Sequence, residues 1–90
     1  MLFALMAFDK PGALEIRKSN RTDHLAYIES TGVVSQAGPL LDENGDMAGS
    51  LVILDMADLT AARNWADNDP YASGGLFERV DLIQWKKVIG

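Results

Sequence analysis

Residues 33–56 read VVSQAGPLLDENGDMAGSLVILDM, a pattern that predicts a β-hairpin. Two largely apolar stretches, 33–41 and 49–56, flank a polar stretch that contains Asn44-Gly45. Asn-Gly between two apolar runs is a strong signal for a tight turn between antiparallel strands. The first stretch contains Gly38-Pro39. Because proline cannot donate a hydrogen bond to a neighbouring strand, we expect this strand to bend or to lie at a sheet edge.

The chain before the hairpin predicts a strand and then a helix. Residues 2–8 form an apolar run that Asp9-Lys10-Pro11-Gly12 ends. This run is too short to cross a membrane, which takes about 20 apolar residues. A secretory signal peptide has a basic region before its apolar run, and here the run follows Met1 directly. We therefore interpret residues 2–8 as a buried first strand.

Residues 13–30 have the pattern of a helix. Leu14, Leu25 and Ile28 fall on one stripe at about 100° per residue, which predicts the buried face. The sequence leaves open whether Ser19-Asn20 interrupts the helix, since both are plausible N-cap residues. Thr31-Gly32 predicts its end, because glycine is the usual residue after a helix C-terminus.

The chain after the hairpin predicts a second helix and a last strand. Asp58 is the expected N-cap, with Leu59, Ala62 and Trp65 (or Ala66) on one face. Asp69-Pro70 predicts the end of that helix, residues 71–75 a short turn and residues 77–89 the closing strand. The resulting order β-α-β-β-α-β is the ferredoxin-like α+β arrangement with an antiparallel sheet.

The strands predict an assembly as well as a fold. Residues 2–8 and 51–54 are apolar at positions that point to both faces of the sheet, although two helices cover only one face. A solvated face of an antiparallel sheet shows alternating polar residues instead. We therefore expect a homodimer in which two sheets pack face to face. The alternative is a monomer with a hydrophobic groove for a ligand.

Composition limits the classes of function. The chain has 90 residues, enough for a single domain spanning 1–90, and 48% of them are hydrophobic. Its net charge of −5 disfavours nucleic-acid and anionic-membrane partners, which need a basic surface. The chain has no cysteine and one histidine. We therefore expect no disulfide, no metal site and a cytoplasmic location.

The histidine, His24, is the first candidate for chemistry because imidazole titrates near neutral pH without assistance. It lies at the border of the predicted apolar stripe, on the same side as Arg17 and Arg21. Arg21 projects between Leu25 and Ile28, and a buried arginine needs a partner. That partner is either a protein carboxylate or the anionic group of a substrate.

The second candidate is Asp69, in the turn Asn68-Asp69-Pro70-Tyr71. One interpretation is that Asp69 simply ends a helix, as Asp before Pro commonly does. The other is that its carboxylate holds the His24 imidazole in one tautomer, as in His–Asp pairs of enzymes. The sequence leaves both interpretations open.

Other local patterns are weak. Residues 42–46 resemble the start of a calcium loop, but Gly45 is at the fourth position instead of the sixth and Ile53 replaces the required glutamate. Gly74-Gly75 lacks the strand–loop–helix context of a nucleotide site. We expect Ser50 to be a strand residue that lines a pocket, Trp65 and Trp85 to be core or interface residues, and Lys86-Lys87 to be a solvated strand edge.

Six short motifs follow one another along the chain: Arg21-x-x-His24-Leu25, Gly38-Pro39, Gly49-Ser50, Ala66-x-x-Asp69-Pro70-Tyr71, Gly75-Leu76-Phe77 and Trp85-Lys86-Lys87-Val88. In this order they resemble the YciI-like (YCII-related) family through essentially the whole chain. The resemblance implies a ferredoxin-like dimeric α+β barrel, related in architecture to muconolactone isomerase. It also implies a histidine–aspartate site in a cleft near the dimer interface. By motif, the site consists of His24 and Asp69, with Arg21, Gly38, Pro39, Ser50 and Tyr71 as substrate-binding neighbours. Asp42 is the rival acidic partner.

The family resemblance and the residues together predict a small enzyme without a cofactor. His24 would act as general acid or base on a small anionic, aromatic-derived substrate, in an isomerisation, elimination or hydrolysis. Family members have been linked to the breakdown of substituted, including chlorinated, aromatic intermediates. A non-catalytic dimeric module that binds a small anion is the alternative. A third reading is that Arg21, His24 and Asp69 form only a structural network between the helices.

Overall fold

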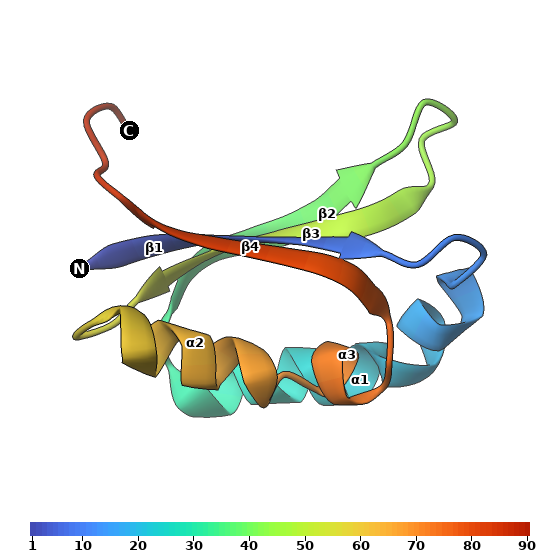
Figure 1. Ribbon diagram of the computed structural model, residues 1–90, viewed down its shortest axis with the longest axis horizontal. Helices are drawn as coiled ribbons and strands as arrows, with labels where there is room; N and C mark the ends of the chain where they lie inside the picture. The colour runs from blue at the N-terminus through green and yellow to red at the C-terminus, as the bar shows by residue number, and fades with distance from the viewer.

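The structure, a computed structural model, describes residues 1–90 and contains one antiparallel sheet covered on one face by helices (Figure 1). The sheet has four strands in the order β2-β3-β1-β4, and every neighbouring pair is antiparallel. This order confirms the ferredoxin-like α+β fold. The elements are β1 (Leu2–Asp9), α1 (Leu14–Thr31), β2 (Val34–Leu41), β3 (Met47–Asp55), α2 (Leu59–Asp67), α3 (Pro70–Ser73) and β4 (Phe77–Trp85).

The hairpin between β2 and β3 forms as its sequence predicts, with Gly45 in the left-handed region at φ 81°. The Asp42 carboxylate accepts hydrogen bonds from the backbone N–H groups of Asn44 and Asp46, at 2.8 and 3.1 Å. β2 is an edge strand, which is where the proline within it can be accommodated. β3 starts at Met47, two residues earlier than the apolar run suggests, because the pairing of Leu41 with Met47 extends the hairpin.

Two predicted boundaries are wrong. The closing strand ends at Trp85 instead of Ile89, because Trp85 pairs with Leu2, the first residue of β1, and no partner strand continues beyond it. Lys86-Lys87 therefore follows the strand. The expected turn at residues 71–75 contains most of the single helical turn α3, whose Tyr71 N–H is capped by the Asp69 carboxylate.

α1 runs without interruption through Ser19 and Asn20. Their side chains donate hydrogen bonds to the carbonyls of Glu15 and Ile16, at 2.8 and 2.9 Å, one turn earlier in the same helix. These bonds replace the capping bonds that would begin a new helix. The predicted end is confirmed, since Gly32 adopts φ 65° and donates to the Ile28 carbonyl.

The core lies between the sheet and α2. Alternate residues of β1 and β3 point toward the helices, and α2 adds one apolar face; the buried set is Phe3, Leu5, Val52, Leu54, Ala62, Trp65 and Ala66. α2 begins as predicted, with the Asp58 carboxylate accepting from the Ala61 N–H at 2.8 Å. The prediction that Leu59 lies on the buried face of α2 is wrong. Leu59 is 45% exposed, because it is the first residue of the helix and lies outside the core cluster.

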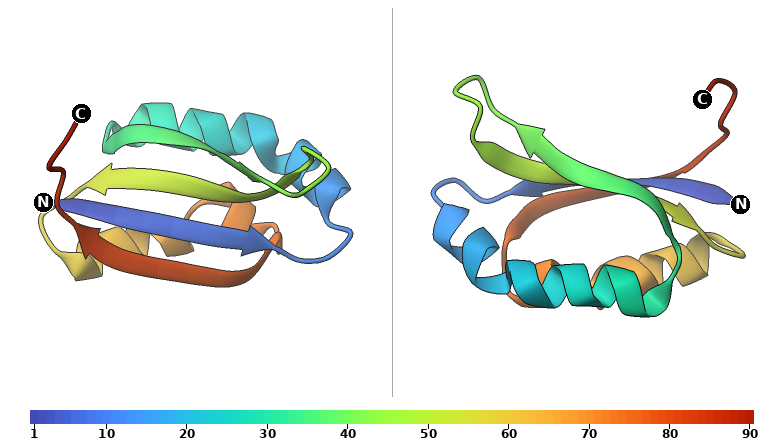
Figure 2. Two further views of the ribbon diagram at one scale, coloured as in Figure 1. Left: turned by 90° about the horizontal axis from the view of Figure 1, so that it is seen from above. Right: turned by 180° about the vertical axis from the view of Figure 1, so that it is seen from behind.

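The predicted buried stripe of α1 is only partly right: Leu14 and Ile28 are half-buried, and Ile28 packs against the core, but Leu25 lies in solvent. Leu25 is 48% exposed, Arg21 is exposed, and the buried residues of the helix are Arg17 and His24. The helix is rotated so that these two polar side chains face the interior. Burial of these two side chains is possible because each contacts a buried carboxylate, as described below. Without such a partner, burial of a charged group would be strongly unfavourable. Figure 2 shows α1 along the β2 side of the sheet and α2 along the β4 side.

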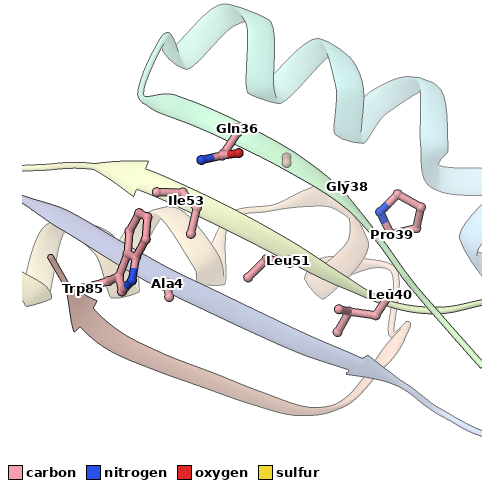
Figure 3. A pocket seen from close by; sticks show the side chains of 9 residues that line it. Ala4, Gln36, Gly38, Pro39, Leu40, Leu51, Ile53 and Trp85 are labelled. Carbon is pink, nitrogen blue, oxygen red and sulfur yellow. The ribbon is translucent and has the colours of Figure 1, made fainter. Parts of the chain in front are cut away.

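The other face of the sheet carries no helix and is largely apolar. Leu51, Ile83 and Trp85 are 38%, 62% and 37% exposed there. A shallow groove of about 550 Å³ crosses this face (Figure 3), lined by Ala4, Gln36, Ala37, Gly38, Pro39, Leu40, Leu51, Ile53 and Trp85. Among the helices, none combines the length and apolarity needed to span a membrane.

The corrected orientation of α1 can be tested with two leucine truncations. Leu54→Ala should lower the free energy of unfolding by about 2–5 kcal/mol, because Leu54 is fully buried and its loss leaves a cavity. Leu25→Ala should cost less than about 1 kcal/mol, since half of that side chain is already in water and alanine favours helix. Urea denaturation followed by circular dichroism measures both. Equal losses for the two variants would contradict the burial of α1 described above.

Candidate active site

The short helix α3 places Asp69 and Tyr71 against α1. The Asp69 carboxylate accepts a hydrogen bond from the Tyr71 backbone N–H at 3.0 Å, which caps α3. The same oxygen, Oδ1, lies 2.7 Å from His24 Nδ1. Asp69 therefore caps α3 and also contacts the histidine.

The His24–Asp69 contact is almost completely shielded from water. The two side chains are 8% and 2% exposed. When Asp69 is ionised, its carboxylate can only accept a hydrogen bond, so the proton of the neutral imidazole sits on His24 Nδ1. Nε2 is then left as the free basic nitrogen. A buried carboxylate that holds Nδ1–H in this way also fixes the orientation of the ring.

Tyr71 packs against the same imidazole. The two rings are stacked, with centroids 3.9 Å apart and an interplanar angle of 14°. The Arg17 guanidinium carbon lies 4.8 Å from the centroid of the Tyr71 ring. Arg17 and His24 are two turns apart on α1, about 10.5 Å. The tyrosine ring contacts both groups across this interval.

Arg17 forms a buried ion pair at the end of β1. Its Nε and Nη2 donate to the two carboxylate oxygens of Asp9 at 2.7 and 2.9 Å, a bidentate arrangement. Nη2 also donates to Ser50 Oγ on β3 at 3.0 Å. The Arg17 and Asp9 side chains are 3% and 6% exposed. Removing one member of such a pair typically costs about 3–5 kcal/mol, so this contact holds α1 against the sheet.

A cavity of about 180 Å³ lies between α1, β2 and β3. It brings together six residues predicted for the site: Arg21, His24, Gly38, Pro39, Ser50 and Tyr71. Asp69 stands behind His24 and does not line the cavity. Asp42 is not the partner of His24, because its carboxylate is occupied by its own hairpin turn. No three or more His, Cys, Asp or Glu side chains gather as a metal-binding set anywhere in the chain.

Two groups beside the cavity keep hydrogen-bonding capacity that the chain does not fill: His24 Nε2, which has no partner, and Arg17 Nη1, whose guanidinium also interacts with the Tyr71 hydroxyl. Every side-chain nitrogen and oxygen that is fully buried has a hydrogen bond. His24 Nε2 and Arg17 Nη1 must therefore be accessible, although their residues are almost entirely buried. The residues line the cavity, so the cavity is where the free atoms can meet a ligand.

The buried groups affect each other's ionisation. Burial raises the pKa of the Tyr71 phenol above its usual value, although the nearby positive charges of Arg17 and Arg21 oppose part of this effect. Burial alone would lower the pKa of Arg17, but the Asp9 carboxylate outweighs this effect and raises it. Burial and the charge of Asp69 both raise the pKa of Tyr27. At neutral pH both phenols are neutral and Arg17 is charged.

Sequence reasoning missed Asp9 and Arg17 as members of this site. It named Arg21 as the buried arginine, yet Arg21 is exposed at the rim and Arg17 is buried at the base. The spacing did contain a signal, because Arg17, His24 and Thr31 are seven residues apart and form one helical stripe. That stripe is polar, so a search for apolar periodicity passed over it.

Comparisons with known proteins place the chain among close relatives. The YCII-related domain family matches residues 1–86. Protein YciI of Escherichia coli O6:H1 is 40% identical, over 98% of this chain and 99% of that protein. An uncharacterized protein of Haemophilus influenzae is 36% identical over the same shares.

Solved structures agree with this placement. TftG, a 5-chloro-2-hydroxyhydroquinone dehydrochlorinase from Burkholderia phenoliruptrix, was solved in complex with 2,5-dihydroxybenzoquinone. It is 33% identical with a TM-score of 0.87, over 96% of this chain and 94% of that chain. SnoaB, a cofactor-independent oxygenase from Streptomyces nogalater, has a TM-score of 0.64 at 15% identity, over 98% of this chain and 95% of that chain. SnoaB therefore shares the fold alone.

The buried phenols predict a loss of stability at alkaline pH. The pKa values of Tyr27 and Tyr71 are raised in the folded chain above the value of about 10 for an unfolded tyrosine. The folded state then holds these protons more tightly, so the free energy of unfolding should fall as pH rises above 10 through the folded pKa values.

Absorbance of tyrosinate at 295 nm checks this prediction. Both tyrosines of the chain should ionise at higher pH in the folded protein than in the same protein dissolved in urea. Tyr71→Phe should remove one half of the absorbance change and part of the alkaline loss of stability. Coincident titration curves in the folded and unfolded states would contradict the burial of the phenols.

Proposed function

Because this chain belongs to the YCII-related family, we propose that it is a small enzyme that works without a cofactor and uses His24 as general acid and base. The observation that supports this proposal best is the 2.7 Å contact of His24 Nδ1 with the buried Asp69 carboxylate, which leaves Nε2 free beside the cavity. Asp69 is the positioning residue for the imidazole. Asp69 also stabilises the imidazolium that forms when Nε2 accepts a proton.

The proposed substrate is a small anionic molecule with one ring. An apolar cavity of about 150 Å³ holds a benzene molecule, so the 180 Å³ cavity suits one six-membered ring with few substituents. Arg21 at the rim supplies the positive charge for the anionic group. Ser50 and Tyr71 offer polar contacts, and Gly38-Pro39 forms a wall without long side chains.

The proposed reaction is an elimination or an isomerisation, with hydrolysis as a third class open to the same residues. His24 Nε2 takes a proton from the ring substrate, and the electron pair left behind forms a new C=C or C=O bond. In an elimination the leaving group departs with its own electron pair, and the imidazolium then returns its proton to solvent. TftG, at 33% identity, is named for a dehydrochlorination, which supports elimination as the first class to assay.

The role of His24 is tested by separating turnover from binding. His24→Gln should lower kcat for a chlorinated hydroxyhydroquinone by about 10²–10⁴, the usual contribution of a general acid–base residue. The affinity for 2,5-dihydroxybenzoquinone, measured by isothermal titration calorimetry, should change little. Asp69→Asn should also lower kcat, because Nδ1 loses its charged acceptor.

Asp67→Asn is the matched control, because it removes the same charge from an exposed position two residues away. Its kcat should equal that of the wild type. If His24→Gln lost affinity and turnover together, a non-catalytic anion-binding module would account for the site instead. If His24→Ala and Asp69→Asn lowered only the melting temperature, the contact would be structural.

We also propose that two copies pack through the open faces of their sheets. This face carries no helix and has exposed apolar side chains on its central strand β3 and on β4. Contiguous apolar surface of this kind is characteristic of an interface. A second copy offers the same apolar residues in return, as an isologous dimer requires.

Ile83→Asp should abolish this dimer. Ile83 is 62% exposed and pairs with Ala4 in the groove, so a charge there would be buried by the partner without compensation. Multi-angle light scattering after gel filtration should give the mass of two chains for the wild type and of one for the variant. Leu59→Asp, on the helical side and 45% exposed, should remain a dimer. A wild-type mass of one chain at micromolar concentration would refute the proposal.

A further inference from the structure

The cavity is lined by two arginines, of which one is paired with a carboxylate and the other is not. Arg17, at the base, is 2% exposed and its charge is cancelled by the bidentate contact with Asp9. Arg21, at the rim, is exposed and makes no ion pair within the chain. If His24 becomes protonated, Asp69 compensates that charge too. The uncompensated positive charge of the cavity is therefore that of Arg21.

The base of the cavity offers directional hydrogen-bond donors. Arg17 uses Nε and Nη2 for Asp9 and Ser50, and its Nη1 carries two further N–H groups beside the Tyr71 hydroxyl and the cavity. A guanidinium has no acceptor atom, so Ser50 Oγ can only accept from it. The Ser50 hydroxyl proton is thus left to donate elsewhere, and Ser50 lines the cavity. Arg17 Nη1 and Ser50 Oγ–H together form a pair of donors.

We infer that the cavity distinguishes two oxygen functions on one ring: Arg21 holds the anionic group, and Arg17 with Ser50 holds a second oxygen that is uncharged in the ground state, a hydroxyl or a keto group. This inference rests on the proposed function and narrows its substrate class to singly charged, single-ring compounds that carry such an oxygen. Arg17 is a binding residue, and Asp9 is the positioning residue for its guanidinium.

The charge balance explains why the second oxygen should be uncharged before reaction. Because the charge of Arg17 is already compensated by Asp9, its N–H and the Ser50 hydroxyl favour an uncharged, polar oxygen in the substrate before reaction. Their hydrogen bonds to that oxygen become stronger when negative charge develops on it. Removal of a proton by His24 Nε2 sends electron density into the ring and toward a ring oxygen. Donors already fixed by Asp9 need no reorganisation at that moment. The arrangement therefore suits an oxygen that becomes an oxyanion only during the reaction.

Equilibrium binding of four simple carboxylates tests the inference without any turnover. The probes are benzoate, which has the anionic group alone, and 2-, 3- and 4-hydroxybenzoate, which add one ring hydroxyl at each position. Isothermal titration calorimetry should show that the wild type prefers at least one hydroxybenzoate over benzoate by about tenfold, the effect of one or two good hydrogen bonds. Equal affinity for all four would overturn the inference.

Three variants assign the preference to its residues. Ser50→Ala and Arg17→Lys should each reduce the preference for the hydroxybenzoate to less than about threefold, while benzoate binding changes little. Arg21→Gln should weaken all four probes alike and leave the preference intact. Ser35→Ala, at an exposed position of β2, is the matched control for Ser50→Ala and should bind as the wild type does.

The results also separate this inference from the proposed catalysis. A preference that survives in Ser50→Ala overturns the inference even if Arg17→Lys fails to fold, because the serine variant removes only one hydroxyl. A preference that disappears in Arg21→Gln overturns it as well, since the rim charge would then be the source. Neither result alters the effect of His24→Gln on kcat, which stands or falls by the turnover assay.

Discussion

The hydrogen bond between His24 Nδ1 and Asp69 Oδ1 joins two segments that are 45 residues apart in the chain and buries both side chains. The rest of the site depends on it, because the same carboxylate oxygen caps α3 and so places the Tyr71 ring on the imidazole. A Cβ at Gly74 would lie 2.7 Å from Asn20 Nδ2, so a larger residue there would displace the Asn20 side chain of α1. A single carboxylate oxygen of Asp69 therefore both caps a helix locally and joins two distant segments of the chain.

Burying so many polar groups is costly unless each has a partner, and the chain meets this condition by pairing them in sequence along α1. Arg17 is matched by Asp9 and Ser50, and His24 by Asp69. The apolar core lies instead under α2, around Trp65, Leu54 and Phe3. The interior is thus mainly apolar under α2 and mainly polar around the cavity, with a second, smaller apolar cluster of Ala13, Tyr71 and Leu76 beside it. This division explains why the helix with the least apolar face lies over the candidate active site.

The edge strand β2 connects the site with the open face of the sheet. Ala37, Gly38 and Pro39 line both the 180 Å³ cavity beside His24 and the 550 Å³ groove on the opposite face. At Gly38 only backbone separates the two spaces, since this residue has no side chain. A second copy packed on the groove would therefore support the wall of the cavity from behind. Assembly and ligand binding would share the same three residues of one strand.

The sequence by itself determined the order of the elements, the hairpin at Asn44-Gly45, the Asp58 and Gly32 caps and the apolar face of α2, because turns, caps and periodicity act over a few residues. Its motifs also named His24 and Asp69 as the candidate pair. The tertiary structure decided which face of α1 is buried: Arg17 instead of Arg21, and Leu25 in solvent. Apolar periodicity could not reveal this orientation, because the helix is oriented by pairs with Asp9 and Asp69, which lie on other elements. The end of β4 at Trp85 was likewise decided by where its partner β1 begins. Contacts between distant segments leave no periodic pattern in the sequence. These contacts nevertheless determine where the polar groups around the cavity lie.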